Sequence, residues 1–147
     1  MTDIDTVLAP VDGTDAATEA ATYAVAIADR YDADLHVVYV LGEGTVRAMD
    51  AGSVAPDSIA DESRAYLGEM RGLAAERSVP ITTTAMAGFS TSIKTLHPGN
   101  VVLDLAEEID ADFLVVPREE PGSDERDVLA KAAEYVLLYA SQPVLSV

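Results

Sequence analysis

Short apolar runs alternate along this chain with longer segments in which apolar residues recur every three or four positions. The short runs have the length and β-branched composition of buried strands, whereas the spaced segments are typical of amphipathic helices. The runs predict strands over residues 5–11, 35–41, 80–87, 113–116 and 143–147. Strict alternation of strands and helices predicts right-handed crossovers and a parallel sheet with helices on both faces.

The helical spacing predicts helices over residues 16–31, 58–77, 101–109 and 128–140. Two connections read as irregular: residues 42–57, with three glycines and Pro56, and the loop Gly88–Asn100, rich in Ser, Thr, Gly and Pro. We therefore expect one α/β domain over residues 1–147, with three layers (α/β/α) and a five-stranded parallel sheet.

The first expected strand ends abruptly at Asp12-Gly13. A glycine at this point lets the backbone turn tightly, and Thr14 or Asp15 can cap the following helix. In open parallel sheets, ligands sit at the carboxyl ends of the central strands. Asp12, Gly13 and Thr14 are therefore candidate ligand-binding residues.

The chain carries 26 acidic and nine basic residues, a formal net charge of −17, and its only lysines are Lys94 and Lys131. Such a surface repels nucleic acid and anionic membranes, so neither is expected as a partner. The charges are spread along the whole chain, Asp outnumbers Glu, and Ala is abundant. This profile predicts a protein kept soluble in a high-salt cytoplasm, hence a halophilic source.

The chain has no cysteine, so it can form neither disulfides nor thiolate metal sites. Its acidic amino terminus lacks the positive segment of a signal peptide, and no apolar run could span a bilayer. The sequence predicts a cytoplasmic protein with no cofactor and no specific metal site.

Four segments, in order, resemble the universal stress protein family: Val11–Thr14, Ala33–Val40, Ala111–Val116 and Ala140–Val147. The resemblance implies strand order 3-2-1-4-5 and a cleft between strands 1 and 4. It also implies that Asp12 and Val40 occupy the positions that contact adenine in nucleotide-binding members.

Nucleotide-binding members also carry a phosphate loop, G-x2-G-x9-G-[S/T], directly after strand 4. In that loop, glycines let backbone N–H groups approach phosphate oxygens at a helix start. The corresponding residues here are Pro117, Glu120, Ala130 and Lys131, and all four depart from the pattern. Pro117 has no N–H, Glu120 adds negative charge, Ala130 adds a Cβ, and Lys131 alone could attract a phosphate.

We therefore expect a non-enzymatic stress-response or regulatory protein that does not bind ATP through a phosphate loop. The alternative is a small-molecule or nucleotide sensor that uses the cleft at Asp12 and the loop Gly88–Asn100. A phosphatase of the D-x-D-G-T type is disfavoured because Pro10 occupies the nucleophile position. Of the two histidines, His36 is expected in the core and His97 in a loop.

The last expected strand lies at a sheet edge in the order 3-2-1-4-5. An apolar edge with unpaired backbone groups favours association unless something covers it. We expect two copies to pair antiparallel there as a homodimer, burying Val144, Leu145 and Val147.

Overall fold

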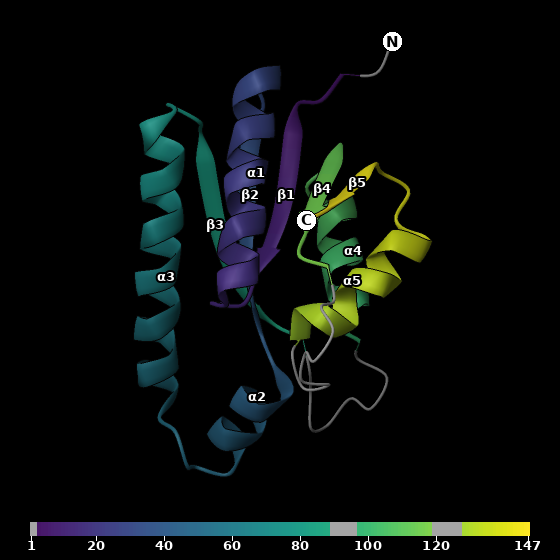
Figure 1. The fold of residues 1–147 in the computed structure, drawn as a ribbon. Coiled ribbons are helices and arrows are strands. Elements are labelled where there is room, and N and C mark those ends of the chain that lie inside the picture. Colours follow the sequence, from purple (N-terminus) through teal and green to yellow (C-terminus); the bar gives the residue numbers. More distant parts are fainter. Residues whose placement is uncertain (1–2, 89–96, 119–127) are drawn as a thin grey trace.

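The computed structural model describes residues 3–88, 97–118 and 128–147. Strands and helices alternate along most of this chain, as the hydrophobic pattern predicts (Figure 1). The elements are β1 (Thr6–Val11), α1 (Asp15–Tyr31), β2 (Asp34–Leu41), α2 (Glu43–Asp50), α3 (Pro56–Glu76), β3 (Ile81–Ala87), α4 (Pro98–Glu108), β4 (Phe113–Val116), α5 (Val128–Tyr139) and β5 (Val144–Ser146).

The five strands form one parallel sheet in the order β3-β2-β1-β4-β5, which confirms the predicted fold class and strand order. β3 pairs along its full length with β2, whereas β5 pairs with β4 over only three residue pairs. β3 and β5 are the two edges of the sheet.

Helices cover both faces of the sheet. On one face α1 and α3 lie side by side, and Tyr39 of β2 packs edge to face against Tyr66 of α3 (Figure 1). On the other face α4 packs against α5. Val40, the next residue of β2, lies near Pro98 and Val128, which are the first residues of α4 and α5. The two side chains face opposite layers because successive residues of a strand alternate between faces.

The first crossover forms for local reasons. Thr14 caps α1, since its Oγ1 accepts a hydrogen bond from the backbone N–H of Ala17 at 3.2 Å. The buried face of α1 is nearly all alanine, whose small side chain lets the helix lie close to the sheet and whose helix propensity is the highest. The helix ends at Asp32, which adopts a left-handed conformation at φ 54°.

Pro10 lies inside a central strand, where proline is rare because it cannot donate a ladder hydrogen bond. The carbonyl of Thr6 accepts from Asp112 beside β4, so the even-numbered residues of β1 direct their backbone groups towards β4. The donor that Pro10 lacks therefore falls on the β4 side, where pairing ends at Leu8 with Leu114. Beyond that pair no ladder pairing joins β1 and β4, and the sheet is open at its carboxyl edge.

Two of the predicted connections are wrong in part. Residues 42–57 are not wholly irregular, because they contain the helix α2. The loop Gly88–Asn100 is shorter than expected at its end, because α4 already begins at Pro98 and includes Asn100. Residues 89–96 of that loop lie outside the described residues.

The two histidines have structural partners. His36 is buried as expected, with both ring nitrogens within hydrogen-bond distance of hydroxyls, Thr82 at 2.6 Å and Thr84 at 3.0 Å. His97 lies outside the helices and strands, as expected, and it caps α4 by accepting from the N–H of Gly99 and stacks on Tyr135.

In the described part of the chain, no helix is both long enough and apolar enough to cross a membrane.

Candidate functional site

A cavity of about 450 Å³ lies at the carboxyl ends of β1 and β2. Its volume is within the range of roughly 300–1,000 Å³ that small-molecule sites occupy. The described lining comes from the β1–α1 turn, the end of β2 with the residues after it, α3 and the first residue of α5. The lining residues are Asp12, Thr14, Tyr39, Val40, Leu41, Gly42, Gly44, Thr45, Ile59, Glu62 and Val128.

The β1–α1 turn is a compact hydrogen-bonded unit. The Oδ1 atom of Asp12 accepts from both the backbone N–H of Thr14 at 3.1 Å and its hydroxyl at 2.6 Å. Gly13 between them has φ 86°, a left-handed conformation that glycine adopts without steric cost. The turn thus fixes a carboxylate at the cavity wall.

Gly13 also makes room for the side chain of Tyr39. A Cβ at this position would lie 3.1 Å from the Tyr39 hydroxyl, closer than ordinary van der Waals contact. Tyr39 is the parallel-register partner of Val11, the residue directly before Asp12. Its hydroxyl therefore lies over the turn, beside the Asp12 carboxylate.

Two tyrosines report the electrostatic character of this side of the cavity. Burial raises the pKa of Tyr39, and the negative charges of Glu62 and then Asp12 raise it further. Burial also raises the pKa of Tyr66, although the hydrogen bond with Thr18, at 2.7 Å, lowers it in part. Both phenols are therefore neutral near pH 7, and at Tyr39 the two neighbouring carboxylates both act in that direction.

The end of β4 offers few donors to an anion. Pro117 is buried and has no N–H, and the N–H of the next residue, Arg118, donates to the main-chain oxygen of Val147 at 3.0 Å. The N–H of Val147 in turn donates to Val116. The first two positions after β4 therefore have no backbone N–H available for a phosphate.

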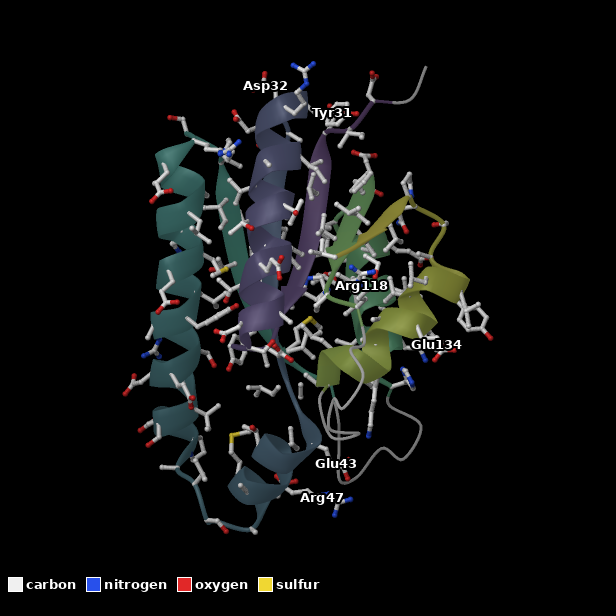
Figure 2. The ribbon with its side chains drawn as sticks, viewed as in Figure 1. Tyr31, Asp32, Glu43, Arg47, Arg118 and Glu134 are labelled. Atoms are coloured by element: carbon white, nitrogen blue, oxygen red, sulfur yellow. The ribbon has the colours of Figure 1, made fainter. Side chains whose placement is uncertain are left out.

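Lys131 lies on α5 and is paired with a carboxylate. Its Nζ is 3.6 Å from Oε2 of Glu43 on α2, and the same glutamate binds Arg47 at 2.9 Å. Figure 2 shows Glu43 near the junction of α2 with the rest of the molecule and Arg47 extending outwards from the helix. The Lys131–Glu43 pair connects α5 to α2, although its two residues are 88 positions apart in the chain.

Gly88, directly after β3, lies where the sheet meets the helices α4 and α5. A Cβ on this residue would lie 2.6 Å from Val40, 2.9 Å from Val128 and 3.1 Å from Pro98. Only a residue without a side chain allows the end of β3 to approach these three groups so closely. This contact sets the position of the first turn of α5 relative to β2.

The predicted site residues divide into two groups. Asp12, Thr14 and Val40 come together in the cavity lining, and Gly13 shapes the turn between the first two. Pro117 and Lys131 are not among its described lining residues. Glu120 lies outside the described residues, and Ala130 belongs to α5 but its side chain is not described.

The sequence analysis missed Tyr39 and Glu62. The register of two parallel strands could have indicated Tyr39, because it stands opposite the residue before Asp12. Glu62 has no comparable signal, since it lies 50 positions from Asp12 on a helix whose rotation the sequence does not determine. Within the described residues, no group of three or more His, Cys, Asp or Glu could hold a metal ion.

The topology, the turn after β1 and the cavity at the carboxyl edge define a doubly wound α/β protein with an open parallel sheet. The sequence model of the Universal stress protein family matches residues 3–147. Universal stress protein MJ0531 of Methanocaldococcus jannaschii is 30% identical over 144 residues, which cover 96% of this chain and 80% of that protein. The chain belongs to the universal stress protein family.

Solved structures show the same fold. The universal stress protein UspA from Lactobacillus plantarum superposes with a TM-score of 0.78 at 24% identity, covering 100% of this chain and 99% of that one. A universal stress protein in complex with cAMP gives a TM-score of 0.71 at 22% identity, with 99% and 98% covered. A universal stress protein from Archaeoglobus fulgidus in complex with dAMP gives 0.65 at 19% identity, also with 99% and 98% covered.

Proposed function

We propose that this universal stress protein is a non-catalytic regulatory module that does not hold ATP through a phosphate loop. The observation that carries the proposal is the end of β4, where Pro117 has no N–H and the N–H of Arg118 is bonded to Val147. Two further features support it: the carboxylates of Asp12 and Glu62 line the cavity, and Lys131 is paired with Glu43. Members of this family are generally not classical enzymes.

Calorimetric titration with Mg-ATP tests the proposal directly. We expect no saturable heat at micromolar ATP, because the described lining of this cavity carries two carboxylates and no Lys, Arg or His. A tight complex with one ATP per chain would contradict the proposal.

A variant that restores the loop pattern provides the control. Replacing Pro117 with Gly, Glu120 with Gly, Ala130 with Gly and Lys131 with Ser together should raise the affinity for ATP. A second variant with only Lys131→Ser removes a positive charge without restoring the loop, and should not gain affinity.

We also propose that the protein is a homodimer paired through β5. The carbonyl of Pro143 and the N–H of Val147 bond to β4, so Val144 and Ser146 direct their backbone groups to the outer edge. Val144, Leu145 and Val147 are only half-buried in the single chain. Just before β5, three consecutive apolar residues of α5 are exposed: Leu137 at 50%, Leu138 at 69% and Tyr139 at 65%.

Sedimentation of the Ser146→Pro variant tests this interface. Proline removes an outward N–H while keeping the bonds to β4, so it should convert a dimer into a folded monomer. Thr83→Pro makes the same change at an outward-facing position of the other edge, β3, and should leave a β5-paired dimer intact. A monomeric parent protein, or a dimer unaffected by Ser146→Pro, would exclude pairing through β5.

A second candidate function is that of a small-molecule sensor, which the cavity of about 450 Å³ favours. Mass spectrometry of small molecules retained after native purification would test it. The cytoplasmic location and the halophilic source remain predictions from the sequence.

A further inference from the structure

β3 is the longer of the two edges of the sheet, with seven residues against three in β5. Its sequence, ITTTAMA, contains neither a charged residue nor a proline, which natural edge strands use to prevent further pairing. The carbonyl of Pro80 and the N–H of Gly88 bond to β2, so the odd-numbered residues of β3 direct their backbone groups outwards. Within the described residues, no backbone bond satisfies these outer groups of Ile81, Thr83, Ala85 and Ala87.

Three consecutive threonines hold β3 in place from both faces. The hydroxyl oxygens of Thr82 and Thr84 lie 2.6 and 3.0 Å from the two ring nitrogens of the buried His36. On the face that α3 covers, the hydroxyl of Thr83 accepts a hydrogen bond from the guanidinium of Arg71 at 2.7 Å. The strand is therefore ordered in advance, which lowers the entropic cost of adding another strand beside it.

An apolar cavity of about 270 Å³ reaches this edge at Ala85. Ala85 is exposed and lines the cavity together with apolar side chains of α2 and α3. The polar side chains of the described lining already have partners: Ser63 donates to the carbonyl of Ile59 at 2.8 Å, and Arg64 pairs with Asp61 at 2.9 Å. The cavity therefore favours an apolar side chain over a polar one.

Arg71 places a positive charge beside this cavity. It forms no ion pair with any described residue, and its partner Thr83 lies two positions before Ala85. Residues two positions apart on a strand share a face and lie about 7 Å from each other. Figure 1 shows α3 along the outer side of β3, so a strand added at this edge would also contact the helix.

We propose that the outer edge of β3 binds an extended segment of a partner protein, in which an acidic residue lies two positions from an apolar one. The apolar side chain, opposite Ala85, enters the cavity, and the carboxylate, opposite Thr83, accepts from Arg71. A second copy of this chain fits poorly, because β3 has no carboxylate and the two Arg71 side chains would repel each other. The proposal goes beyond the proposed function and does not depend on it, since β3 is the edge opposite β5.

The probe is an end-blocked, fluorescent peptide, Val-Glu-Thr-Leu-Thr-Glu-Val, whose side-chain pattern is the same for parallel and antiparallel addition. Its anisotropy is measured in about 1 M KCl, where the Debye length of about 3 Å screens the net charge of −17. We expect saturable binding of one peptide per chain. Replacing the leucine of the peptide with alanine should weaken binding about tenfold, because less apolar surface is buried. Replacing both glutamates with glutamines should weaken it about threefold.

Proline variants at the two edges of the sheet form a matched pair. Thr83→Pro removes an outward N–H of β3 and should weaken peptide binding about tenfold. Ser146→Pro makes the same change on β5 and should leave the affinity within about twofold, because the peptide does not contact that edge. Thermal melts check that each variant is folded.

Arginine variants of α3 test the charge separately. Arg71→Gln should weaken peptide binding about threefold and should abolish the difference between the acidic peptide and its glutamine counterpart. Arg77→Gln removes the same charge from a side chain that pairs with Asp29 of α1 at 3.5 Å, and should leave both affinities unchanged.

The proposal is overturned if the parent protein shows no saturable peptide binding, if a folded Thr83→Pro variant binds like the parent, or if the two arginine variants have equal effects. It is also overturned if the parent self-associates in a way that Thr83→Pro abolishes and Ser146→Pro does not, because the occupant of β3 would then be a second copy. None of these results bears on the proposed lack of ATP binding, which the titration with Mg-ATP tests independently.

Discussion

The turn after β1 and the segment after β4 occupy equivalent places at the carboxyl edge of the sheet, but they differ in what they present. After β1, Gly13 allows a tight turn in which Asp12 accepts two hydrogen bonds from Thr14 and lines the cavity. After β4, Pro117 has no N–H, and the next N–H bonds to Val147. The turn after β1 presents acceptors and negative charge, whereas the first two positions after β4 have no backbone N–H available to a ligand.

The comparison teaches that the fold and the chemistry of the site vary independently. This chain has the sheet order 3-2-1-4-5, and its cavity lies at the carboxyl ends of β1 and β2. At the first two positions after β4, no backbone N–H is available to a phosphate. A shared fold therefore predicts where a ligand would bind better than it predicts which ligand binds.

The largest effect is expected from salt, which tests whether the acidic cleft is a local feature or one part of an acidic molecule. The net charge of −17 should cause self-repulsion that salt screens. Between about 0.1 and 1 M KCl, the midpoint of thermal unfolding should rise by roughly 10 °C, about 3 kcal/mol for a chain of this length. A midpoint that does not change would contradict the halophilic interpretation.

Gly88→Ala disturbs the contact that joins the two sides of the cleft. The added Cβ would lie 2.6 Å from Val40 and 2.9 Å from Val128, so we expect a loss of about 2 kcal/mol in denaturant unfolding. Gly72→Ala is the matched control: it lies in α3 with nothing within 4 Å of the added Cβ, and should be neutral or stabilising by up to about 1 kcal/mol. Similar losses for both variants would show that the junction is not tightly packed.

Thr14→Ala changes only the turn after β1. It removes the α1 cap and the hydroxyl that donates to Asp12, and should cost about 1 kcal/mol in the free energy of unfolding. Thr14→Ser keeps the hydroxyl and should recover most of that loss. If serine restores nothing, the lost stability comes from the methyl group rather than from the cap.

The smallest effect concerns the ionisation of Tyr39. Glu62→Gln should lower the pKa of Tyr39 towards 10.0, its ordinary value, by removing one of the causes that raise it. NMR titration of the tyrosine rings measures this shift. A pKa of Tyr39 that does not respond would place Glu62 too far away to act on the cavity.

The same raised pKa has a consequence for stability at alkaline pH. Above pH 10.0 the unfolded chain loses the Tyr39 proton before the folded chain does, so the free energy of unfolding falls as the pH rises through the raised value. Tyr39→Phe should make this fall shallower in denaturant unfolding measured at increasing pH.

Some features that were missed had a local signal. Three glycines and Pro56 predict that residues 42–57 are irregular, yet this segment contains the helix α2. Its Glu43 and Arg47 form an ion pair at a spacing of four residues, which is a recognised helix-stabilising pattern. The early start of α4 was also readable, because Pro98 suits the first position of a helix and His97 can cap it.

The sequence by itself determined the features that depend on residues close together in the chain. Alternating apolar patterns specified the strands and helices, and Asp12-Gly13-Thr14 specified a capped turn, because those contacts span only a few residues. The tertiary structure alone decided that Glu62 and Tyr39 stand beside Asp12, and that Lys131 pairs with Glu43. Such contacts depend on how far each helix rotates and slides on the sheet, which packing across the whole core determines and local patterns leave open.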